Sequence, residues 1–196
     1  MNTTISTESI QQFFTGARTH HAWQDKPVAD ELLREIYDLA RWGPTSANSS
    51  PMRIHFVKSK AEKEKLFPAP MGGNVEQVRA APVTAIIAYD QKFYDELPAL
   101  YPAFDMRSLF VSNPSMSEQT AFRNSSLQGA YFILAARALG LDGGPMSGFD
   151  NAKVDQAFFE KSSWKSNFLC NIGYGDAAKL NPRGPRLSSE KACVIA

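Results

Sequence analysis

The chain has 196 residues, and its 21 lysines and arginines nearly balance its 20 aspartates and glutamates, giving a formal net charge of +1. This length suits one well-packed domain, so residues 1–196 are expected to form a single domain. The balanced charge, with no Lys/Arg block, argues against a nucleic-acid partner. The most apolar runs, residues 83–88 and 131–136, are far shorter than the roughly 20 residues that cross a bilayer, so no membrane partner is expected.

Two further features of the sequence point to a cytoplasmic protein. The polar N-terminal residues lack the basic start and apolar core of a secretory signal. The two cysteines, Cys170 and Cys193, are too far apart in sequence for a redox pair or a zinc site. We therefore expect cytoplasmic localisation and two ordinary thiols.

Hydrophobic spacing predicts helices and strands in mixture along the chain. Asp30 is the predicted N-cap of the first strong helix, and Gly43 and Pro44 end that helix. Gly140 is the predicted stop of the longest helix. The predicted elements are, in order, a helix at 31–42, strands at 52–57 and 82–89, helices at 121–139 and 154–159, and a strand at 167–174. This pattern indicates an α+β domain with several helices around a sheet.

The common catalytic motifs are missing from the sequence. Neither the G-x-G-x-x-G nor the G-x-x-x-x-G-K-[ST] phosphate loop occurs, so a nucleotide would have to be held in another way. Residues 162–165 match the S-x-x-K motif of penicillin-binding enzymes, but the companion motifs are absent. His20 and His21 are adjacent and His55 has no partner at ligand spacing, so no metal site is expected.

Five polar clusters remain, and their order along the chain resembles that of the nitroreductase family. One is a dense run of hydroxyls and an amide between a predicted helix and strand, which by itself could be a turn whose side chains bond their own backbone. The clusters are residues 18–23, residues 43–51, Asn74, residues 144–149 and residues 183–186. The resemblance implies a nitroreductase-like α+β fold, with a central, mostly antiparallel sheet flanked by helices. It also implies an intertwined homodimer that binds FMN in two clefts between the subunits.

The resemblance assigns the phosphate end of FMN to basic residues from both ends of the chain. Arg18 would donate a forked pair of hydrogen bonds and Thr19 a hydroxyl. Arg183 or Arg186 would complete the anion site, and the sequence does not choose between them. Without the resemblance, a solvated charge at a helix end is the simpler interpretation of Arg18.

Two positions in the N-terminal cluster depart from the family pattern. The family commonly has a basic residue where this chain has Ala17, and an Arg or Lys where it has His21. His20 and His21 are included among the cofactor-binding residues because an imidazole can still donate to the flavin, although two surface histidines are the simpler interpretation.

The hydroxyl-rich run would lie across the flavin from the partner subunit. The residues with this implied role are Pro44, Thr45, Ser46 and Asn48. Many relatives have Gln just before the second proline, whereas this chain has the shorter Ser50.

The ring of the flavin is assigned to Asn74 and to the segment around Gly148. The Asn74 amide would meet the pyrimidine edge, and a helix N-cap is the alternative role for this residue. Backbone N–H groups of Ser147 and Gly148 would face flavin N5, beside Pro145 and Met146. The alternative interpretation of this Gly/Pro segment is an ordinary connecting loop.

The implied activity is that of an FMN-dependent oxidoreductase with NADH or NADPH as hydride donor, acting by ping-pong alternation without a dedicated side-chain acid. The amino-acid sequences of residues 18–28 and 140–150 resemble those of the malonic semialdehyde reductases of pyrimidine (uracil) catabolism. This resemblance predicts that the small-molecule substrate is malonic semialdehyde, reduced to 3-hydroxypropionate. Arg53, Arg107 and Arg123 are candidates for the substrate carboxylate by charge alone. The alternatives are a broad nitroarene or quinone reductase, a non-catalytic flavin-binding protein, and a dimeric interaction module without a cofactor.

Overall fold

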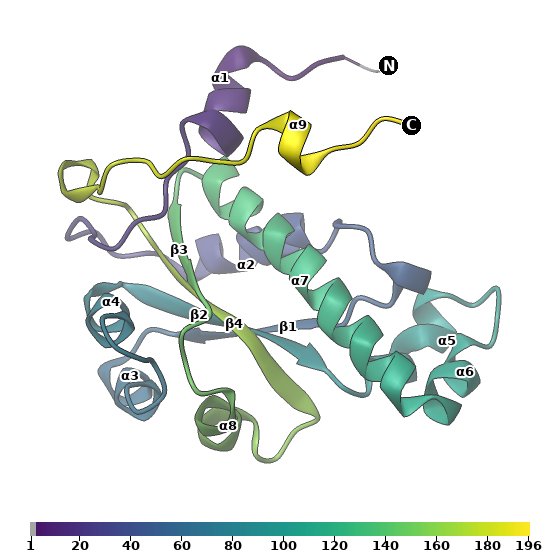
Figure 1. The fold of residues 1–196 in the computed structure, drawn as a ribbon. Coiled ribbons are helices and arrows are strands. Elements are labelled where there is room, and N and C mark those ends of the chain that lie inside the picture. The colour runs from purple at the N-terminus through teal and green to yellow at the C-terminus, as the bar shows by residue number, and fades with distance from the viewer. Residues whose placement is uncertain (1–2) are drawn as a thin grey trace.

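A computed structural model describes residues 3–196 of the chain. Its centre is a four-stranded antiparallel sheet in the order β1-β2-β4-β3 (Figure 1). The strands are β1 (Met52–Val57), β2 (Val83–Asp90), β3 (Asp142–Met146) and β4 (Trp164–Gly173). The register of β2 against β4 shifts at Ile87 and Ala88, where the ladder has an irregularity.

The helical elements are short except for α2 and the long α7. The α-helices are α1 (Thr7–Ile10), α2 (Asp30–Ala40), α3 (Lys60–Leu66), α4 (Asn74–Ala80), α5 (Leu97–Leu100), α6 (Met106–Ser112), α7 (Pro114–Ala138), α8 (Asn151–Val154) and α9 (Ser189–Ala192). Two π-helical turns, η1 (Gln11–Thr15) and η4 (Asp155–Phe159), and three 3-10 turns, η2 (Ser46–Asn48), η3 (Phe93–Glu96) and η5 (Ala177–Lys179), complete the order.

Helices cover both faces of the sheet, as Figure 1 shows. On one face α2 and α7 enclose a core to which β2 contributes Val83, Ala85 and Ile87. On the other face α3, α4 and α8 enclose a second core, to which β2 contributes Ile86 and Ala88. Because successive side chains of a strand point to opposite faces, this near-continuous apolar strand serves both cores. The predicted α+β class, with helices flanking an antiparallel sheet, is confirmed.

Several element boundaries differ from the sequence predictions. The strand at 52–57 is confirmed, and Gly140, with φ +74°, follows the end of α7 as predicted. Asp30 as N-cap is wrong, because Asp30 is the first helical residue and Ala29 precedes it. The helix predicted at 121–139 begins earlier, at Pro114. Its first two turns were not predicted, because they are largely polar and carry no apolar period.

Two predicted elements have a different extent or type. The last strand was predicted at 167–174 but spans Trp164–Gly173. The helix predicted at 154–159 divides into α8 and the π-helical turn η4. Strand β3 was not predicted, because its sequence Asp-Gly-Gly-Pro-Met has the composition of a turn and tertiary pairing with β4 extends it.

A third, smaller core lies at the N-terminal end of α7. Phe93, Leu97 and Phe110 from the α5–α6 region are buried there against Ala121 and Tyr89. This core holds the α5–α6 segment at the opposite end of α7 from α1 and α9 (Figure 1). Among the helices of the described residues, none has both the length and the apolarity that a membrane span requires.

Candidate functional site

A cleft of about 600 Å³ near the chain termini brings together most of the predicted basic residues. Arg18, Thr19 and His21 line it from the N-terminal segment, and Arg183 and Arg186 line it from the C-terminal segment. Arg137, from the last turn of α7, also lines the cleft. Sequence reasoning missed Arg137, because it lies on the helix predicted at 121–139, outside the five polar clusters.

The N-terminal cluster is positioned by backbone contacts with strand β3. Thr19 forms a parallel bridge with Gly143, and the His20 N–H donates to the Gly143 carbonyl at 3.2 Å. Gly144 has no room for a side chain, because a Cβ there would lie 2.6 Å from the His20 carbonyl oxygen. The close approach of the two segments therefore requires glycine at this point of β3.

The C-terminal segment is held to the same wall by a reciprocal pair of hydrogen bonds. The Arg18 guanidinium donates to the Asn181 carbonyl, and Arg183 Nη2 donates to the Ala17 carbonyl at 3.0 Å. Residues 17–18 and 181–183 are thus joined although they are far apart in sequence. Arg186 bonds only the nearby carbonyls of Gly184 and Pro185.

The cleft is strongly cationic. Within residues 3–196, none of the four cleft arginines has an aspartate or glutamate within ion-pair distance, although ten other lysine or arginine pairs and two histidine contacts of that kind are present. Guanidinium groups gathered without carboxylates form a site for an anion such as a phosphate. This arrangement can replace the phosphate-binding glycine loop that the sequence lacks.

His20 lies away from the cleft. Its side chain is buried, its Nε2 lies 3.5 Å from Asp142 Oδ1, and its ring lies so close to Gly175 that a Cβ there would come within 2.1 Å of Nδ1. Of the two adjacent histidines, the structure therefore brings only His21 to the cleft. The opposite directions of neighbouring side chains on an extended segment explain the difference.

Asn74 and Gly148 meet at a second point. Asn74 Nδ2 donates to the Gly148 carbonyl at 2.9 Å, and the Met71 N–H donates to the same oxygen at 2.9 Å. The alternative role of Asn74 as N-cap is wrong, because Gly73 precedes the helix and Asn74 is its first residue. A Cβ on Gly148 would lie 2.7 Å from Asn74 Nδ2, so this contact also requires glycine.

The backbone after β3 presents free donors. Pro145 and Met146 complete β3, where Pro145 is exposed and Met146 packs in the second core. Neither the Ser147 N–H nor the Gly148 N–H donates to any other group among the described residues. Two consecutive unpaired N–H groups on a partly exposed segment are suited to stabilise negative charge on a ligand.

A path of contacts connects the cationic cleft with these donors. His21 Nδ1 lies 2.9 Å from Gln77 Oε1, and Gln77 is one turn of α4 from Asn74. Along the sheet edge, Thr19 contacts Gly143. Gly143 and Ser147 are four positions apart, which corresponds to about 13 Å along an extended strand. An elongated ligand with an anionic end therefore finds partners along one continuous edge of β3.

The hydroxyl-rich loop at 43–51 lies elsewhere in the chain. The Ser46 N–H donates to Asn124 Oδ1 at 2.8 Å, and Asn48 Nδ2 donates to the Leu100 carbonyl at 2.9 Å. Asn124 and Arg137 are thirteen residues apart on α7, which corresponds to about 20 Å along the helix axis. Pro44, Thr45, Ser46 and Asn48 are therefore not brought into the cationic cleft of their own chain.

A family model described as the nitroreductase family matches residues 15–174, which is most of the chain. The chain belongs to the nitroreductase family.

Solved structures of nitroreductases share this fold. A protein from Exiguobacterium sibiricum, assigned as a nitroreductase and solved in complex with FMN, has 21% identity and a TM-score of 0.83, with 100% of both chains covered. A nitroreductase family protein from Streptococcus pneumoniae has 22% identity and a TM-score of 0.82, with 96% of this chain and 98% of that chain covered. A protein from Staphylococcus epidermidis, assigned as an NAD(P)H:FMN oxidoreductase, has 20% identity and a TM-score of 0.83, with 100% and 99% covered.

The three arginines proposed for a substrate carboxylate differ in availability in this nitroreductase. Arg53 Nη2 lies 3.0 Å from Asp90 Oδ2, and Arg107 Nη2 lies 2.8 Å from Asp95 Oδ1, so both already have a carboxylate partner. Arg123 is exposed on α7, next to the Asn124 that holds the 43–51 loop. Within the described residues Arg123 has no ion-pair or hydrogen-bond partner.

Other candidate groups of the sequence have structural roles. Ser163 Oγ donates to Asp90 at 2.6 Å and Lys165 lies 3.5 Å from Asp155, so the S-x-x-K segment is committed to local contacts. Burial raises the pKa of the Cys170 thiol to about 12, which keeps it protonated and unreactive. Within residues 3–196, no group of three or more His, Cys, Asp or Glu side chains is arranged to hold a metal ion.

Proposed function

We propose that this nitroreductase is an FMN-dependent oxidoreductase that uses NADH or NADPH as hydride donor. The observation that carries the proposal is the continuous edge of β3, which has uncompensated guanidiniums at one end and the unpaired N–H groups of Ser147 and Gly148 at the other. Family membership and the FMN in the Exiguobacterium structure support the identity of the ligand.

The residues along this edge fit FMN chemically. Arg18, Arg183 and Arg186 supply charge-assisted donors to a phosphate that carries nearly two negative charges. Thr19 and His21 supply polar groups beside it. A Cβ on Gly148 would collide with Asn74, so glycine at this position lets the Asn74 amide lie against the backbone beside the unpaired N–H groups.

Bound FMN would accept a hydride from the nicotinamide at N5 and return it to the second substrate. The Ser147 and Gly148 N–H groups would stabilise the negative charge that develops on the ring. The β3–β4 ladder ends at Met146 just before them, and Met71 and Asn74 hold the Gly148 carbonyl, so these groups need little reorganisation. One Asn74 N–H donates to the Gly148 carbonyl, and the Asn74 Oδ1 and its second N–H would meet the pyrimidine edge of the ring.

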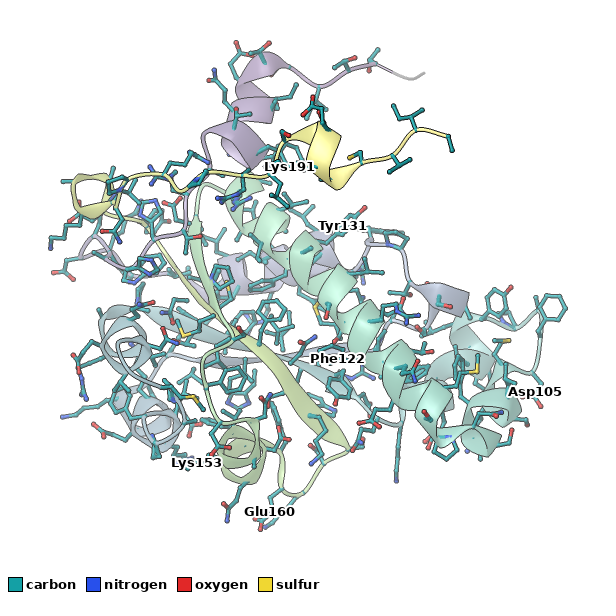
Figure 2. All side chains as sticks on the ribbon, in the orientation of Figure 1. Asp105, Phe122, Tyr131, Lys153, Glu160 and Lys191 are labelled. Carbon is teal, nitrogen blue, oxygen red and sulfur yellow. The ribbon has the colours of Figure 1, made fainter. Side chains whose placement is uncertain are left out.

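The 43–51 loop would reach the flavin from a second copy of the chain. None of its residues lines the cleft of its own chain, and Ser46 contacts α7 at Asn124, about 20 Å along the helix from Arg137. This arrangement supports a site completed across a homodimer. Large side chains on α7 are also left uncovered: Phe122, Leu127 and Tyr131 are 50%, 48% and 41% exposed, and two of them are labelled in Figure 2. Such an apolar strip is suited to a subunit interface.

The substrate that we propose is malonic semialdehyde, reduced to 3-hydroxypropionate in the cytoplasm as a step of uracil breakdown. Support comes from the resemblance of residues 18–28 and 140–150 and from Arg123, which has a free guanidinium for the substrate carboxylate. The carbonyl carbon takes the hydride, and the carbonyl oxygen takes a proton from water or from the exposed Ser147 hydroxyl.

One spectroscopic experiment tests the flavin assignment. The purified protein, incubated with FMN and desalted, should keep the visible absorption of oxidised flavin, and anaerobic NADH or NADPH should bleach it. Colourless protein would leave only a cofactor-free interaction module, and coloured protein that resists both nicotinamides would be a flavin-binding protein without this activity. The rival enzyme, a nitroarene or quinone reductase, is separated by comparing kcat/KM for malonic semialdehyde with that for nitroarenes, and an inert aldehyde would overturn the substrate proposal.

A further inference from the structure

Arg137 occupies a special position at the base of the cationic cleft. It lies in the last turn of α7, and its side chain is half-buried, unlike the exposed Arg183 and Arg186. Its Nη1 donates to the Phe13 carbonyl at 2.7 Å, and its own carbonyl accepts a hydrogen bond from Gln12 Nε2 at 2.6 Å. Arg137 therefore joins the end of α7 to η1, the turn that leads into Arg18.

Arg137 has no direct ion-pair partner within the described part of the chain, and the more distant Asp142 carboxylate offsets only part of the cost of burying its charge. Its guanidinium has five N–H donors, of which the Phe13 carbonyl takes one, and no carboxylate lies within ion-pair distance. Burial lowers the pKa of Arg137, which shows that its surroundings disfavour the charge. Because a half-buried cation without a partner is costly, an anion bound in the cleft would offset that cost.

Arg137 lies where the sequence lacks an expected cation. The family resemblance of the N-terminal cluster implies a basic residue at the position of Ala17, and Ala17 and Arg137 line the same cleft. The methyl group of Ala17 leaves space, and its backbone carbonyl is already taken by Arg183. A guanidinium that reaches the cleft from α7 can therefore supply the missing charge.

From this placement, and resting on the proposed FMN site, we infer that Arg137 is a ligand of the cofactor phosphate and takes over the role of the basic residue absent at position 17. The Phe13 carbonyl orients the guanidinium, and the remaining N–H donors face the anion. Arg137 thus contributes to selectivity for a phosphorylated flavin over an unphosphorylated one.

The test compares FMN with riboflavin, because the two ligands differ only in the phosphate. Apo-protein is titrated into each flavin, and binding is followed by quenching of flavin fluorescence. For Arg137→Gln we expect FMN affinity to fall roughly tenfold or more, with little change for riboflavin. Arg137→Lys keeps the positive charge but loses the paired hydrogen bonds of the planar guanidinium, so it should recover part of the FMN affinity. The matched control is Arg34→Gln, since Arg34 is an exposed arginine on α2 outside the cleft.

The outcomes separate this inference from the proposed function. A tenfold or larger drop in the ratio of FMN to riboflavin affinity in Arg137→Gln, absent in the Arg34→Gln control, supports a phosphate ligand. Equal losses for both flavins, or no loss, would overturn the inference and leave Arg137 as a structural tie between α7 and η1. If Arg137→Gln does not fold, the same ratio is measured on Arg137→Lys, for which an unchanged ratio and unchanged FMN affinity count against phosphate binding. Wild-type protein that binds neither flavin would instead refute the proposed FMN site itself.

Discussion

The cationic cleft and the 43–51 loop were both predicted as cofactor-binding segments, but they use their polar groups differently. In the cleft, backbone bridges hold the chain, and the guanidinium groups keep donors free for a ligand. In the loop, Thr45 Oγ1 accepts a hydrogen bond from the Ser50 N–H at 3.1 Å, and Asn48 Nδ2 donates to the Leu100 carbonyl. The number of polar side chains in a segment is therefore a poor guide to ligand capacity, and the number left unpaired is a better one.

Backbone strain also distinguishes the two regions. Ala47, Asn48 and Ser50 have φ values of 50°, 48° and 39°, in the left-handed region that side chains disfavour. The cleft segments have no such residues among those that the structure describes. The interpretation of the loop as a turn that bonds its own backbone is confirmed for Thr45, while the strain indicates that surrounding contacts determine its shape.

The largest effect is expected at the ring end of the proposed site. Gly148→Val should lower the rate of NADH-driven flavin reduction roughly a hundredfold or more, because a side chain there collides with Asn74 and moves the N–H donors. Anaerobic stopped-flow absorbance measures the rate. Gly73→Ala is the control, since a Cβ at Gly73 meets no atom within 4 Å and its φ is −65°. A Gly148→Val enzyme with normal reduction would remove this segment from the site.

A mixing experiment addresses the division between cleft and loop directly. Arg18→Ala should weaken FMN binding by about 2 kcal/mol through the loss of a charge-assisted contact. Ser46→Trp should block the site from the loop side, and Ser46 is exposed in its own chain, so the fold should tolerate the indole.

If the two segments form one site across a dimer, a heterodimer of these variants has one site with both defects and one intact site. Unfolding and refolding the variants together should then restore tight FMN binding to about a quarter of the sites, whereas each variant alone stays weak. Ultrafiltration with flavin absorbance measures the bound fraction. No recovery on mixing, with proven heterodimers, would place both segments in the same chain's site, and tight FMN binding by Ser46→Trp alone would show that the loop is uninvolved.

A smaller effect is expected where α7 holds the loop. Asn124→Ala should lower the free energy of unfolding by about 1–2 kcal/mol, because it leaves the Ser46 N–H without its partner. Urea denaturation measures this, and Gln119→Ala is the control on the exposed side of the same helix. A loss of stability confined to Asn124→Ala, with weaker FMN binding, would connect the shape of the loop to the cofactor. Unchanged stability would show that the loop holds its shape without Asn124.

The smallest effect concerns strain in the loop. Ala47→Gly should raise the free energy of unfolding by up to about 1 kcal/mol, because glycine adopts a φ of 50° without a steric penalty and loses only part of that gain to its greater freedom when unfolded. Thermal unfolding of both proteins without flavin measures the difference. A lower melting temperature for the variant would mean that Ala47 is held by contacts of its methyl group rather than against strain.

The sequence predicted the parts of this protein in which local pattern and tertiary packing agree. Strand β1, the end of α7 at Gly140 and the buried β2 follow from apolar periodicity and from glycine's tolerance of positive φ. The family resemblance named five of the eight polar residues that line the cleft and missed Thr15, Arg137 and Asn181. It could not separate His20 from His21, because the direction of each side chain depends on the bridges to β3 and to Gly175.

By itself, the sequence determined an α+β nitroreductase domain with basic residues near both ends of the chain. Only the tertiary structure decided that these segments meet, that Arg137 lies in the cleft that they form, and that Ser46 contacts α7 at Asn124, about 20 Å along the helix from Arg137. The physical reason is that local periodicity records which face of an element is buried, whereas the meeting of distant segments depends on how the sheet orders its strands. Strand β3 is the clearest case: its glycine-rich sequence resembles a turn, and pairing with β4 makes it the edge along which the proposed site is built.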